Sequence, residues 1–492
     1  LSRAAAVLRW DQETCLPPGG VEDRAEQLAV LEGLAHERLV NPEIGRLLKE
    51  FPDFSGFPPE GDLPAPEQDF IRVLRRDYDR AAALPVDFVR EAARAEGLSQ
   101  AAWVEARKNS DFAAFAPHLQ KMLDFARKKA AYWGFGGTAK GESLYDGLLD
   151  LHEPGMNQAD LAALFAPLGE KLSGLLKKIA PLPPPEDRFL HERYDPAAQA
   201  DFNRRLMAGL GFDMRRGRLD VSAHPFTTTL GFNDVRITTR YFPDNPLSGI
   251  FSVIHESGHA FYEMGIDPAL RSGCLAEGVS MGIHESQSRL WENVIGRSRA
   301  FWEGWFPLLR AQFPAQLGAV DGEAFYRALN RAGPSPIRVD ADELSYSLHI
   351  ILRFELEKRL FSGELDVDGL PAAWNRAVKD YLGIESENDA AGGVLQDVHW
   401  SMGAFGYFPS YALGNLYSLL FWKKLKEDLP GIESALERRE YGGIHGWLGE
   451  KIHRWGRRLN PGELLMNITG ETLSAGPFLE YVEGKYRELY GI

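Results

Sequence analysis

The segment 249–266, GIFSVIHESGHAFYEMGI, is the feature that most restricts how this chain can fold. It carries His255 and His259 at a spacing of four residues, with Glu256 directly after the first histidine. In an α-helix, residues four apart project from the same face, so both imidazoles can reach one tetrahedral zinc ion. Glu256 then lies beside the water that such a metal activates, where it suits a general base better than a third ligand. The spacing therefore predicts a zinc-binding helix and a fold that brings a further ligand to it.

The third zinc ligand has to come from elsewhere in the chain, because a catalytic zinc has three protein ligands and one open position. One class of zinc peptidases carries Gly and His where this chain has Tyr262 and Gly265, so that class is excluded. A downstream glutamate is the alternative, and Glu277 and Glu285 compete for the role. We prefer Glu285 because Arg289, one helical turn later, can hold its outer oxygen. A surface ion pair of Glu285 with Arg289 is the competing interpretation, and spacing alone does not decide between the two glutamates.

Most of the chain is predicted to be helical, because stretches rich in Ala, Leu, Glu and Arg carry apolar residues at intervals of three and four. Segments 21–39 and 276–295 are two examples. A small antiparallel sheet is expected over 218–242, where β-branched residues surround the turn-like sequence GFND. Prolines at 181–185 interrupt the helical pattern and mark a candidate subdomain boundary. The simplest architecture is one mainly α unit that spans residues 1–492.

Charge and cysteine usage narrow the partners and the compartment. The formal net charge of −15 argues against a nucleic-acid partner, because phosphate binding needs clustered Lys and Arg. Cys15 and Cys274 are the only cysteines of the sequence, too few for a disulfide framework, and this favours a reducing cytoplasm. No apolar run reaches the ~20 residues that cross a bilayer, so no membrane span is expected.

Six short motifs follow one another between residues 224 and 400. They are His224-Pro225-Phe226; Asp234, Arg236 and Thr238; the zinc motif; HESQ at 284–287; Ile337, Arg338, Ala341 and Asp342; and Gly393, Gln396, Asp397, His399 and Trp400. The sequence WDQET at 10–14 belongs to the same pattern. With these motifs, the chain resembles the carboxypeptidase Taq family of zinc metallocarboxypeptidases.

The resemblance implies zinc, or cobalt in its place, bound by His255, His259 and Glu285, and so decides against Glu277. It implies a large helical zincin-like body with a deep groove, assembled as a homodimer. It also implies that single residues are removed from peptide C-termini, so that the partners are peptides with a free C-terminus.

Recognition of a free carboxylate favours arginine, whose planar guanidinium can donate two charge-assisted hydrogen bonds. Arg236 and Arg338 are therefore the candidates for substrate binding. A structural ion pair with a neighbouring aspartate is the alternative for each. Arg353 is left out, because it would lie about four helical turns beyond Arg338 in a continuous helix.

Hydrolysis of a peptide places negative charge on the former carbonyl oxygen, which calls for a hydrogen-bond donor. His399, Tyr407 and Tyr411 are suitable donors, and we prefer His399 and Tyr407 as catalytic residues and Tyr411 as a substrate-binding residue. Ordinary aromatic core is the alternative, since such rings pack well. Gly403 and Gly406 favour a loop that lines a cleft.

Three other motif residues receive roles next to the site. His224, at the edge of the predicted sheet, is expected to bind the substrate backbone. Asp342 or Asp397 is expected to orient a ligand histidine through its outer nitrogen.

The leading hypothesis is a zinc metallocarboxypeptidase in which Glu256 is the general base. A rival within the same class is a zinc oligopeptidase or dipeptidyl carboxypeptidase, because helical zinc peptidases with a downstream glutamate ligand include both. A rival of another kind is a helical scaffold with structural zinc. Structural sites normally fill all four positions with Cys or His, which disfavours the scaffold.

Overall fold

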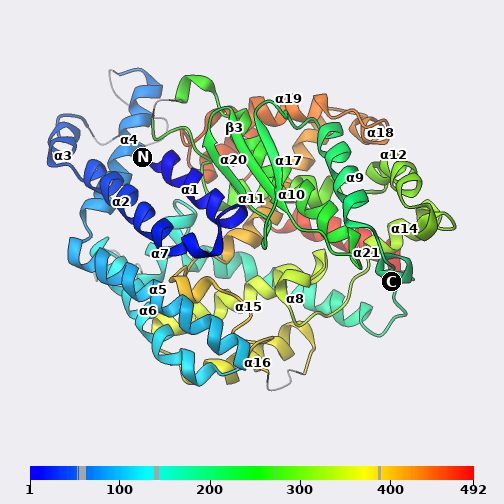
Figure 1. The fold of residues 1–492 in the computed structure, drawn as a ribbon, viewed down its shortest axis with the longest axis horizontal. Coiled ribbons are helices and arrows are strands. Elements are labelled where there is room, and N and C mark those ends of the chain that lie inside the picture. Colours follow the sequence, from blue (N-terminus) through cyan, green and yellow to red (C-terminus); the bar gives the residue numbers. More distant parts are fainter. Residues whose placement is uncertain (53, 55–62, 138–142, 272, 386–388) are drawn as a thin grey trace.

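The computed structural model describes residues 1–52, 54, 63–137, 143–271, 273–385 and 389–492 (Figure 1). Within these residues the chain is mainly helical, as predicted, with a small sheet in the middle of the sequence. The helices before the sheet are α1 (Ser2–Thr14), η1 (Pro18–Gly20), α2 (Val21–Leu39), α3 (Pro42–Leu48), α4 (Ala65–Ala82), α5 (Val86–Asn109), α6 (Phe112–Tyr132), α7 (Leu144–His152), α8 (Gln158–Ile179), η2 (Arg188–His191) and α9 (Pro196–Gly209).

The sheet is followed by the second and longer helical part of the chain. Its elements are α10 (Pro246–Gly265), η3 (Pro268–Leu270), α11 (Met281–Arg289), the π-helix η4 (Leu290–Ile295), α12 (Arg299–Gln312), α13 (Pro314–Leu317), α14 (Gly322–Leu329), η5 (Arg338–Asp340), α15 (Glu343–Ser362), α16 (Leu370–Leu382), η6 (His399–Met402), α17 (Pro409–Asp428), α18 (Ile432–Glu437), α19 (Gly442–Lys451), η7 (His453–Trp455), α20 (Pro461–Thr469) and α21 (Gly476–Tyr490). Within the described part of the chain, no helix is both long and apolar enough to cross a membrane.

The sheet is mixed rather than purely antiparallel. It consists of β1 (Gly217–Val221), β2 (Thr227–Gly231) and β3 (Asp234–Thr239) in the order β1-β3-β2. The expected hairpin exists, because β2 and β3 pair antiparallel around the turn at Phe232 and Asn233. The antiparallel prediction is wrong for β1, which runs parallel to β3. The connection from β1 crosses to the far edge before the chain returns, and alternation of side chains along a strand does not reveal this.

Two helices next to the sheet carry the HExxH motif and the downstream glutamate. Helix α10 begins where Asn245 accepts a hydrogen bond from the amide of Ser248, with Pro246 in the first turn. Helix α11 begins only at Met281, because Ser280 caps it by accepting from the amide of Ile283. The helix predicted over 276–295 is therefore five residues too long at its start, and its last part is a π-helix.

Close packing of α10, α11 and α17 brings these elements together. A side chain at Gly258 would lie 2.7 Å from the carbonyl oxygen of Gln287 on α11. A side chain at Gly414 of α17 would lie 2.5 Å from Cγ of Glu285. Glycine is required at both positions, because any larger residue would separate the helices that form the site.

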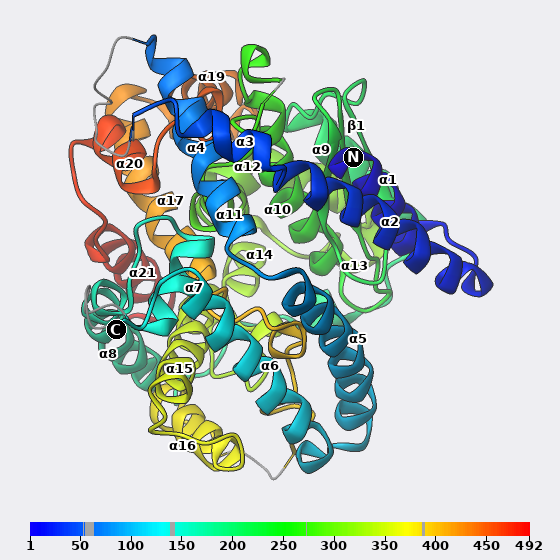
Figure 2. The ribbon, with the colours of Figure 1, turned by 90° about the vertical axis from the view of Figure 1, so that its left-hand side faces the viewer.

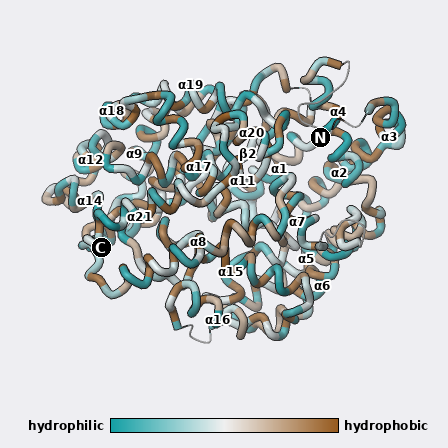
Figure 3. The backbone as a smooth tube through the Cα atoms, turned by 180° about the vertical axis from the view of Figure 1, so that it is seen from behind, coloured by the Kyte–Doolittle hydropathy of each residue, from teal (hydrophilic) through white to brown (hydrophobic). Residues whose placement is uncertain are grey.

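Figures 1 and 2 both draw α5, α6, α15 and α16 together on one side of the molecule, with the sheet, α9 and α10 on the opposite side. Hydrophobic segments recur along α15 and α17 (Figure 3), and most side chains of these two helices are buried. One continuous cluster of buried residues includes both Leu176, before 181–185, and Leu206, after it. We retain a single unit as a proposal on this ground, and the subdomain boundary near 181–185 stays a prediction.

Candidate active site

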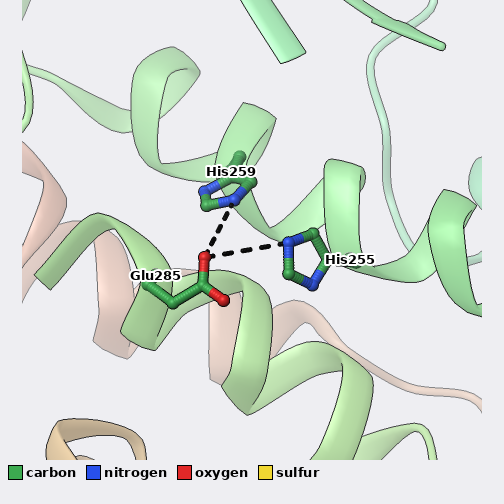
Figure 4. Close-up of side chains that lie close together, drawn as sticks. All are labelled: His255, His259 and Glu285. Atoms are coloured by element: carbon green, nitrogen blue, oxygen red, sulfur yellow. Dashed lines mark ion pairs between the residues drawn. The ribbon is translucent and has the colours of Figure 1, made fainter. Parts of the chain in front are cut away.

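His255, His259 and Glu285 converge from α10 and α11 on one point (Figure 4). Oε2 of Glu285 lies 3.8 Å from Nε2 of His255 and 3.5 Å from Nε2 of His259. The three ligand atoms lie within 4.8 Å of one another, which leaves space for an ion between them. Two imidazole nitrogens and one carboxylate oxygen are the donors that catalytic zinc sites use, so these residues fit a metal of this kind.

Glu277 lies outside this cluster. Its carboxylate is 3.5 Å from Nη1 of Arg457, and 71% of its side chain is exposed. Glu285, in contrast, is buried, and Nε of Arg289 donates to its Oε1 at 2.7 Å. Burial by itself raises the pKa of Glu285, but the charges of Arg289 and His255 hold that pKa well below its usual range. The interpretation of Glu285 and Arg289 as a surface ion pair is therefore wrong, since both side chains are only about a tenth exposed.

The Nδ1 atoms of His255 and His259 each contact another side chain, which leaves their Nε2 atoms for a metal. Nδ1 of His255 lies 2.7 Å from Oε2 of Glu292, on the π-helix. Nδ1 of His259 lies 2.6 Å from Nδ1 of His284, whose Nε2 lies 2.8 Å from Oε1 of Glu263. Partners at these positions orient ligand histidines and fix their tautomers.

The sequence-based expectation for these partners was wrong. Asp342 caps α15 by accepting hydrogen bonds from the amides of Leu344 and Ser345. Asp397 binds arginines instead of a ligand histidine. The available signal was His284 itself, the first residue of HESQ, whereas nothing in the local sequence pointed to Glu292.

Glu256 is buried on α10 beside the cluster. Thr227 of β2 donates a hydrogen bond from Oγ1 to Oε2 of Glu256 at 2.6 Å. Burial raises the pKa of Glu256, while the neighbouring His255 acts in the opposite direction. Sequence reasoning missed Thr227, although it follows His224-Pro225-Phe226 directly, because strand-to-helix contacts cannot be read from spacing.

A cavity of about 430 Å³ opens onto the cluster. It is lined by Pro225, Phe226, Thr227, His255, Glu256, His259, Met281, His284, Glu285, Tyr407, Ser410 and Tyr411. His224 is exposed and precedes Pro225 in the sequence, but it is not itself part of this lining, so its expected contact with the substrate stays a prediction. The cavity therefore brings together the metal-binding cluster, Glu256 and both predicted tyrosines.

His399 lies behind the tyrosines and is not part of the cavity lining. Its Nε2 lies 3.2 Å from the hydroxyl of Tyr411. Burial lowers the pKa of His399 to about 4, so the imidazole is neutral at neutral pH. Burial also raises the pKa of Tyr407 to about 12 and that of Tyr411 well above its usual value. Both phenols therefore keep their protons and can act as donors.

Arg338 and Arg353 share one carboxylate behind Tyr411. Nε of Arg338 donates to Oδ1 of Asp397 at 2.9 Å, and Nε of Arg353 donates to Oδ2 at 2.7 Å. Nη1 of Arg338 also donates to the hydroxyl of Tyr346 at 3.0 Å, and its guanidinium lies 5.2 Å from the ring centre of Tyr411. The two guanidiniums face a single acid, so positive charge remains in excess at this ion pair.

Arg353 is fully buried and is not part of the cavity lining, so leaving it out of the substrate site stays a prediction. The distance from Arg338 that a continuous helix would give, however, was wrong. A separation of four helical turns requires one continuous helix, whereas η5 ends at Asp340 and α15 begins at Glu343 after a turn. The chain therefore changes direction between Arg338 and Arg353, and Asp397 reaches both.

Arg236 does not lie in the cavity. It donates from Nε and Nη2 to Asp234 at 2.8 and 2.9 Å, and its guanidinium lies 4.3 Å from the ring centre of Trp10. Arg218 lies against the same ring at 5.3 Å. This arrangement matches the alternative of a structural ion pair, and a substrate role for Arg236 stays a prediction without support from its position.

The helical body and the HExxH helix with its nearby glutamate define the class of the protein, a metallopeptidase. Within this class the chain belongs to the carboxypeptidase Taq (M32) metallopeptidase family, whose model matches residues 1–486. It is 43% identical to thermostable carboxypeptidase 1 of Thermus thermophilus over 496 aligned residues, which cover 100% of this chain and 96% of the relative. Carboxypeptidase 1 of Bacillus subtilis is 40% identical, with 99% and 96% covered.

Solved structures agree with this assignment. The crystal structure of an M32 carboxypeptidase from Deinococcus radiodurans superimposes with a TM-score of 0.94 at 42% identity, covering 100% of this chain and 96% of that one. The protein is accordingly a metallocarboxypeptidase, an enzyme that hydrolyses peptides at their C-termini. Family membership removes the alternative of a helical scaffold without activity.

Proposed function

We propose that the protein is a zinc carboxypeptidase that removes single residues from peptides with a free C-terminus, with Glu256 as general base. One observation carries the substrate part of this proposal. Arg338 and Arg353 share Asp397 directly behind Tyr411, which lines the same cavity as the His255 cluster. None of these three charged residues belongs to the cavity lining, but the guanidinium of Arg338 lies 5.2 Å from the ring centre of Tyr411, which does. A buried excess of positive charge next to a lining residue suits a substrate that brings its own carboxylate.

His255, His259 and Glu285 are the residues that would hold the metal. Zinc fits their donor set, and cobalt accepts the same nitrogen and oxygen ligands. When bound, zinc supplies Lewis acidity, which polarises the peptide carbonyl and lowers the pKa of water at the site.

Glu256 takes a proton from the attacking water and passes it to the leaving amine. Its position supports this role, because the carboxylate is buried beside His255 and is held at Oε2 by Thr227. A base that is fixed in one orientation before the substrate binds needs no rearrangement during the reaction.

The phenol of Tyr407 donates a hydrogen bond to the carbonyl oxygen as negative charge develops there. Tyr411 binds the substrate, and His399 positions Tyr411 through the contact between Nε2 and the phenol hydroxyl. His224 contacts the substrate backbone. Arg338 binds the terminal carboxylate, and Arg236 is left out of the carboxylate site because it is paired with Asp234.

The free carboxylate provides the test. An N-blocked dipeptide is compared with the same dipeptide as its C-terminal amide, and the acid should have a kcat/KM at least ~100-fold higher, as expected when a buried charge pair loses one partner. Equal cleavage of both would overturn the exopeptidase proposal in favour of the oligopeptidase. A longer peptide separates single-residue release from release of dipeptides, because mass spectrometry shows which fragment leaves first.

Metal analysis and a Glu256→Gln variant test the chemistry. The proposal expects one zinc per chain in both proteins and loss of turnover in the variant alone.

We further propose that the protein works in the cytoplasm as a homodimer and does not bind nucleic acid. The homodimer rests on the family resemblance, and the other two statements rest on the cysteine content and the net charge. Sedimentation equilibrium of the full chain tests the homodimer, and a monomer at micromolar concentration would contradict it.

A further inference from the structure

Three of the buried polar side chains of helix α15, those of His349, Arg353 and Glu357, follow one another at intervals of four residues. Residues at this spacing lie along one face of a helix. All three are fully buried, and buried polar groups on a helix need partners that satisfy them. Arg353 finds its partner in Asp397, two residues before His399, so the same face of α15 supports the chain that leads into the cavity.

Glu357 accepts three hydrogen bonds. The indole Nε1 of Trp400 donates to Oε1 at 2.7 Å, and the amide of Gly406 donates to Oε2 at 2.8 Å. The hydroxyl of Tyr145, from α7, donates to Oε2 at 2.7 Å. Two of the three donors therefore belong to the segment 399–408, which connects His399 to Tyr407.

Gly406 transmits this contact to the cavity. Its backbone is left-handed, with φ of 76°, and a side chain there would lie 2.8 Å from the carbonyl carbon of Leu148. The next residue, Tyr407, packs edge-on against His152 with ring centres 5.1 Å apart and lines the cavity. The hydrogen bond from Gly406 to Glu357 thus fixes the backbone from which Tyr407 projects.

We propose that Glu357 is a positioning residue that holds segment 399–408 and thereby aims the Tyr407 hydroxyl at the reacting carbonyl. The inference rests on the proposed role of Tyr407. It assigns different kinetic effects to two neighbours on one face of α15: Glu357 acts on kcat through Tyr407, whereas Arg353 acts on KM through Asp397 and Arg338.

The test is Glu357→Gln in the zinc-loaded full chain, with an N-blocked dipeptide as substrate. An amide keeps the volume but replaces an acceptor oxygen with a donor, so at least one bond to the segment is lost. We expect kcat to fall roughly 10- to 100-fold, the size associated with a misplaced catalytic group, while KM changes less than about 2-fold. Zinc affinity, measured by competition with a chelator, should be unchanged.

Glu343→Gln is the matched control. Glu343 lies at the start of the same helix, is buried, and pairs with Nζ of Lys485 at 2.6 Å, away from segment 399–408. This variant should lose thermal stability and keep its kcat. Tyr145→Phe removes the one donor that lies outside the segment, so kcat should also be kept. If Glu357→Gln does not fold, Trp400→Phe removes one bond from the other side and should lower kcat in the same sense.

Combining Glu357→Gln with Tyr407→Phe tests whether Glu357 acts through the Tyr407 hydroxyl. If Glu357 acts through the Tyr407 hydroxyl, Glu357→Gln has little further effect on kcat once that hydroxyl is gone. An unchanged kcat in Glu357→Gln, or an equal loss with and without the hydroxyl, would overturn the inference. A Tyr407→Phe enzyme with full kcat would instead refute the proposed role of Tyr407, which is a separate failure.

Discussion

The Nδ1 atoms of His259 and His284 lie 2.6 Å apart, so one imidazole donates a hydrogen bond to the other. If Nε2 of His259 faces the metal, its Nδ1 carries the proton and Nδ1 of His284 accepts. Nε2 of His284 then donates to Glu263, whose other oxygen accepts from Thr229 at 3.0 Å. A ligand histidine is thus oriented by a second histidine and a carboxylate behind it.

Glu263→Gln should weaken zinc binding by about 10- to 100-fold, the range typical of partners that orient a ligand. The amide can present a donor to Nε2 of His284, and the sequence of donors and acceptors from His259 through His284 to residue 263 is then disrupted. Competition with a chelator of known affinity measures the effect directly. Glu277→Gln is the control, because that side chain is largely exposed and lies outside the cluster. An equal loss of zinc affinity in both variants would contradict the role of Glu263 in orienting His259 through His284.

Thr227→Val should lower kcat by roughly 10-fold or more, the value of one hydrogen bond to a charged group, and leave zinc affinity unchanged. Valine keeps the shape of threonine but cannot hold Oε2 of Glu256. Steady-state kinetics and metal titration separate the two effects. Thr228→Val is the matched control, since neighbouring residues of a strand point to opposite faces, and a similar loss there would exclude a specific contact.

Arg338→Lys should reduce kcat/KM for the free-acid dipeptide by about 100-fold, because a lysine ammonium cannot reproduce the planar fork of a guanidinium. The slow cleavage of the dipeptide amide should change little. The ratio of the two rates is the diagnostic quantity. An Arg236→Lys enzyme should keep the wild-type ratio, and an Arg338→Lys enzyme that keeps it would exclude Arg338 from carboxylate binding.

Glu153 makes stability depend on pH. It lies in the interior, where its Oε2 accepts from the amide of Gly282 at 3.0 Å and its Oε1 from the hydroxyl of Tyr417 at 2.9 Å. Burial raises its pKa from 4.5 to about 7, so the folded chain holds this proton more tightly than the unfolded chain. The stabilising contribution is complete below pH 4.5 and is lost as the pH rises through about 7.

Wild type should therefore lose about 3 kcal/mol relative to Glu153→Gln between pH 4.5 and 8, since the amide does not titrate. Urea unfolding of both proteins across this range measures the difference, in which other titrating groups cancel. A constant difference would mean that Glu153 ionises normally in the folded chain.

The local parts of the site could be predicted because helix geometry alone relates them. His255, Glu256 and His259 occupy one turn of α10, so their mutual arrangement follows from their spacing. The assignment of Glu285 as the third ligand could not be made from spacing, which left Glu277 as an alternative. The family resemblance decided between the two glutamates. The mainly helical fold followed in the same way from apolar residues at intervals of three and four.

Contacts between distant elements could not be predicted. Thr227 reaches Glu256 from a strand, and Asp397 joins Arg338 to Arg353 from a segment more than 40 residues further along. Such pairs depend on how helices pack, which leaves no periodic trace in the sequence. The parallel pairing of β1 with β3 escaped prediction for the same reason.

The π-helix at Leu290–Ile295 makes this metal site sensitive to chain length as well as to side-chain chemistry. Its wider turn accommodates one more residue than an α-helical turn, and Glu292 within it reaches His255. Deleting Leu290 would favour an ordinary α-helix over this stretch, which turns Glu292 relative to α11 while the residues beyond the stretch keep their phase. Glu285 and Arg289, upstream, would keep their places while Glu292 would turn away. The zinc affinity of a Leu290 deletion would therefore register a change in helical phase that no substitution at the ligands can mimic.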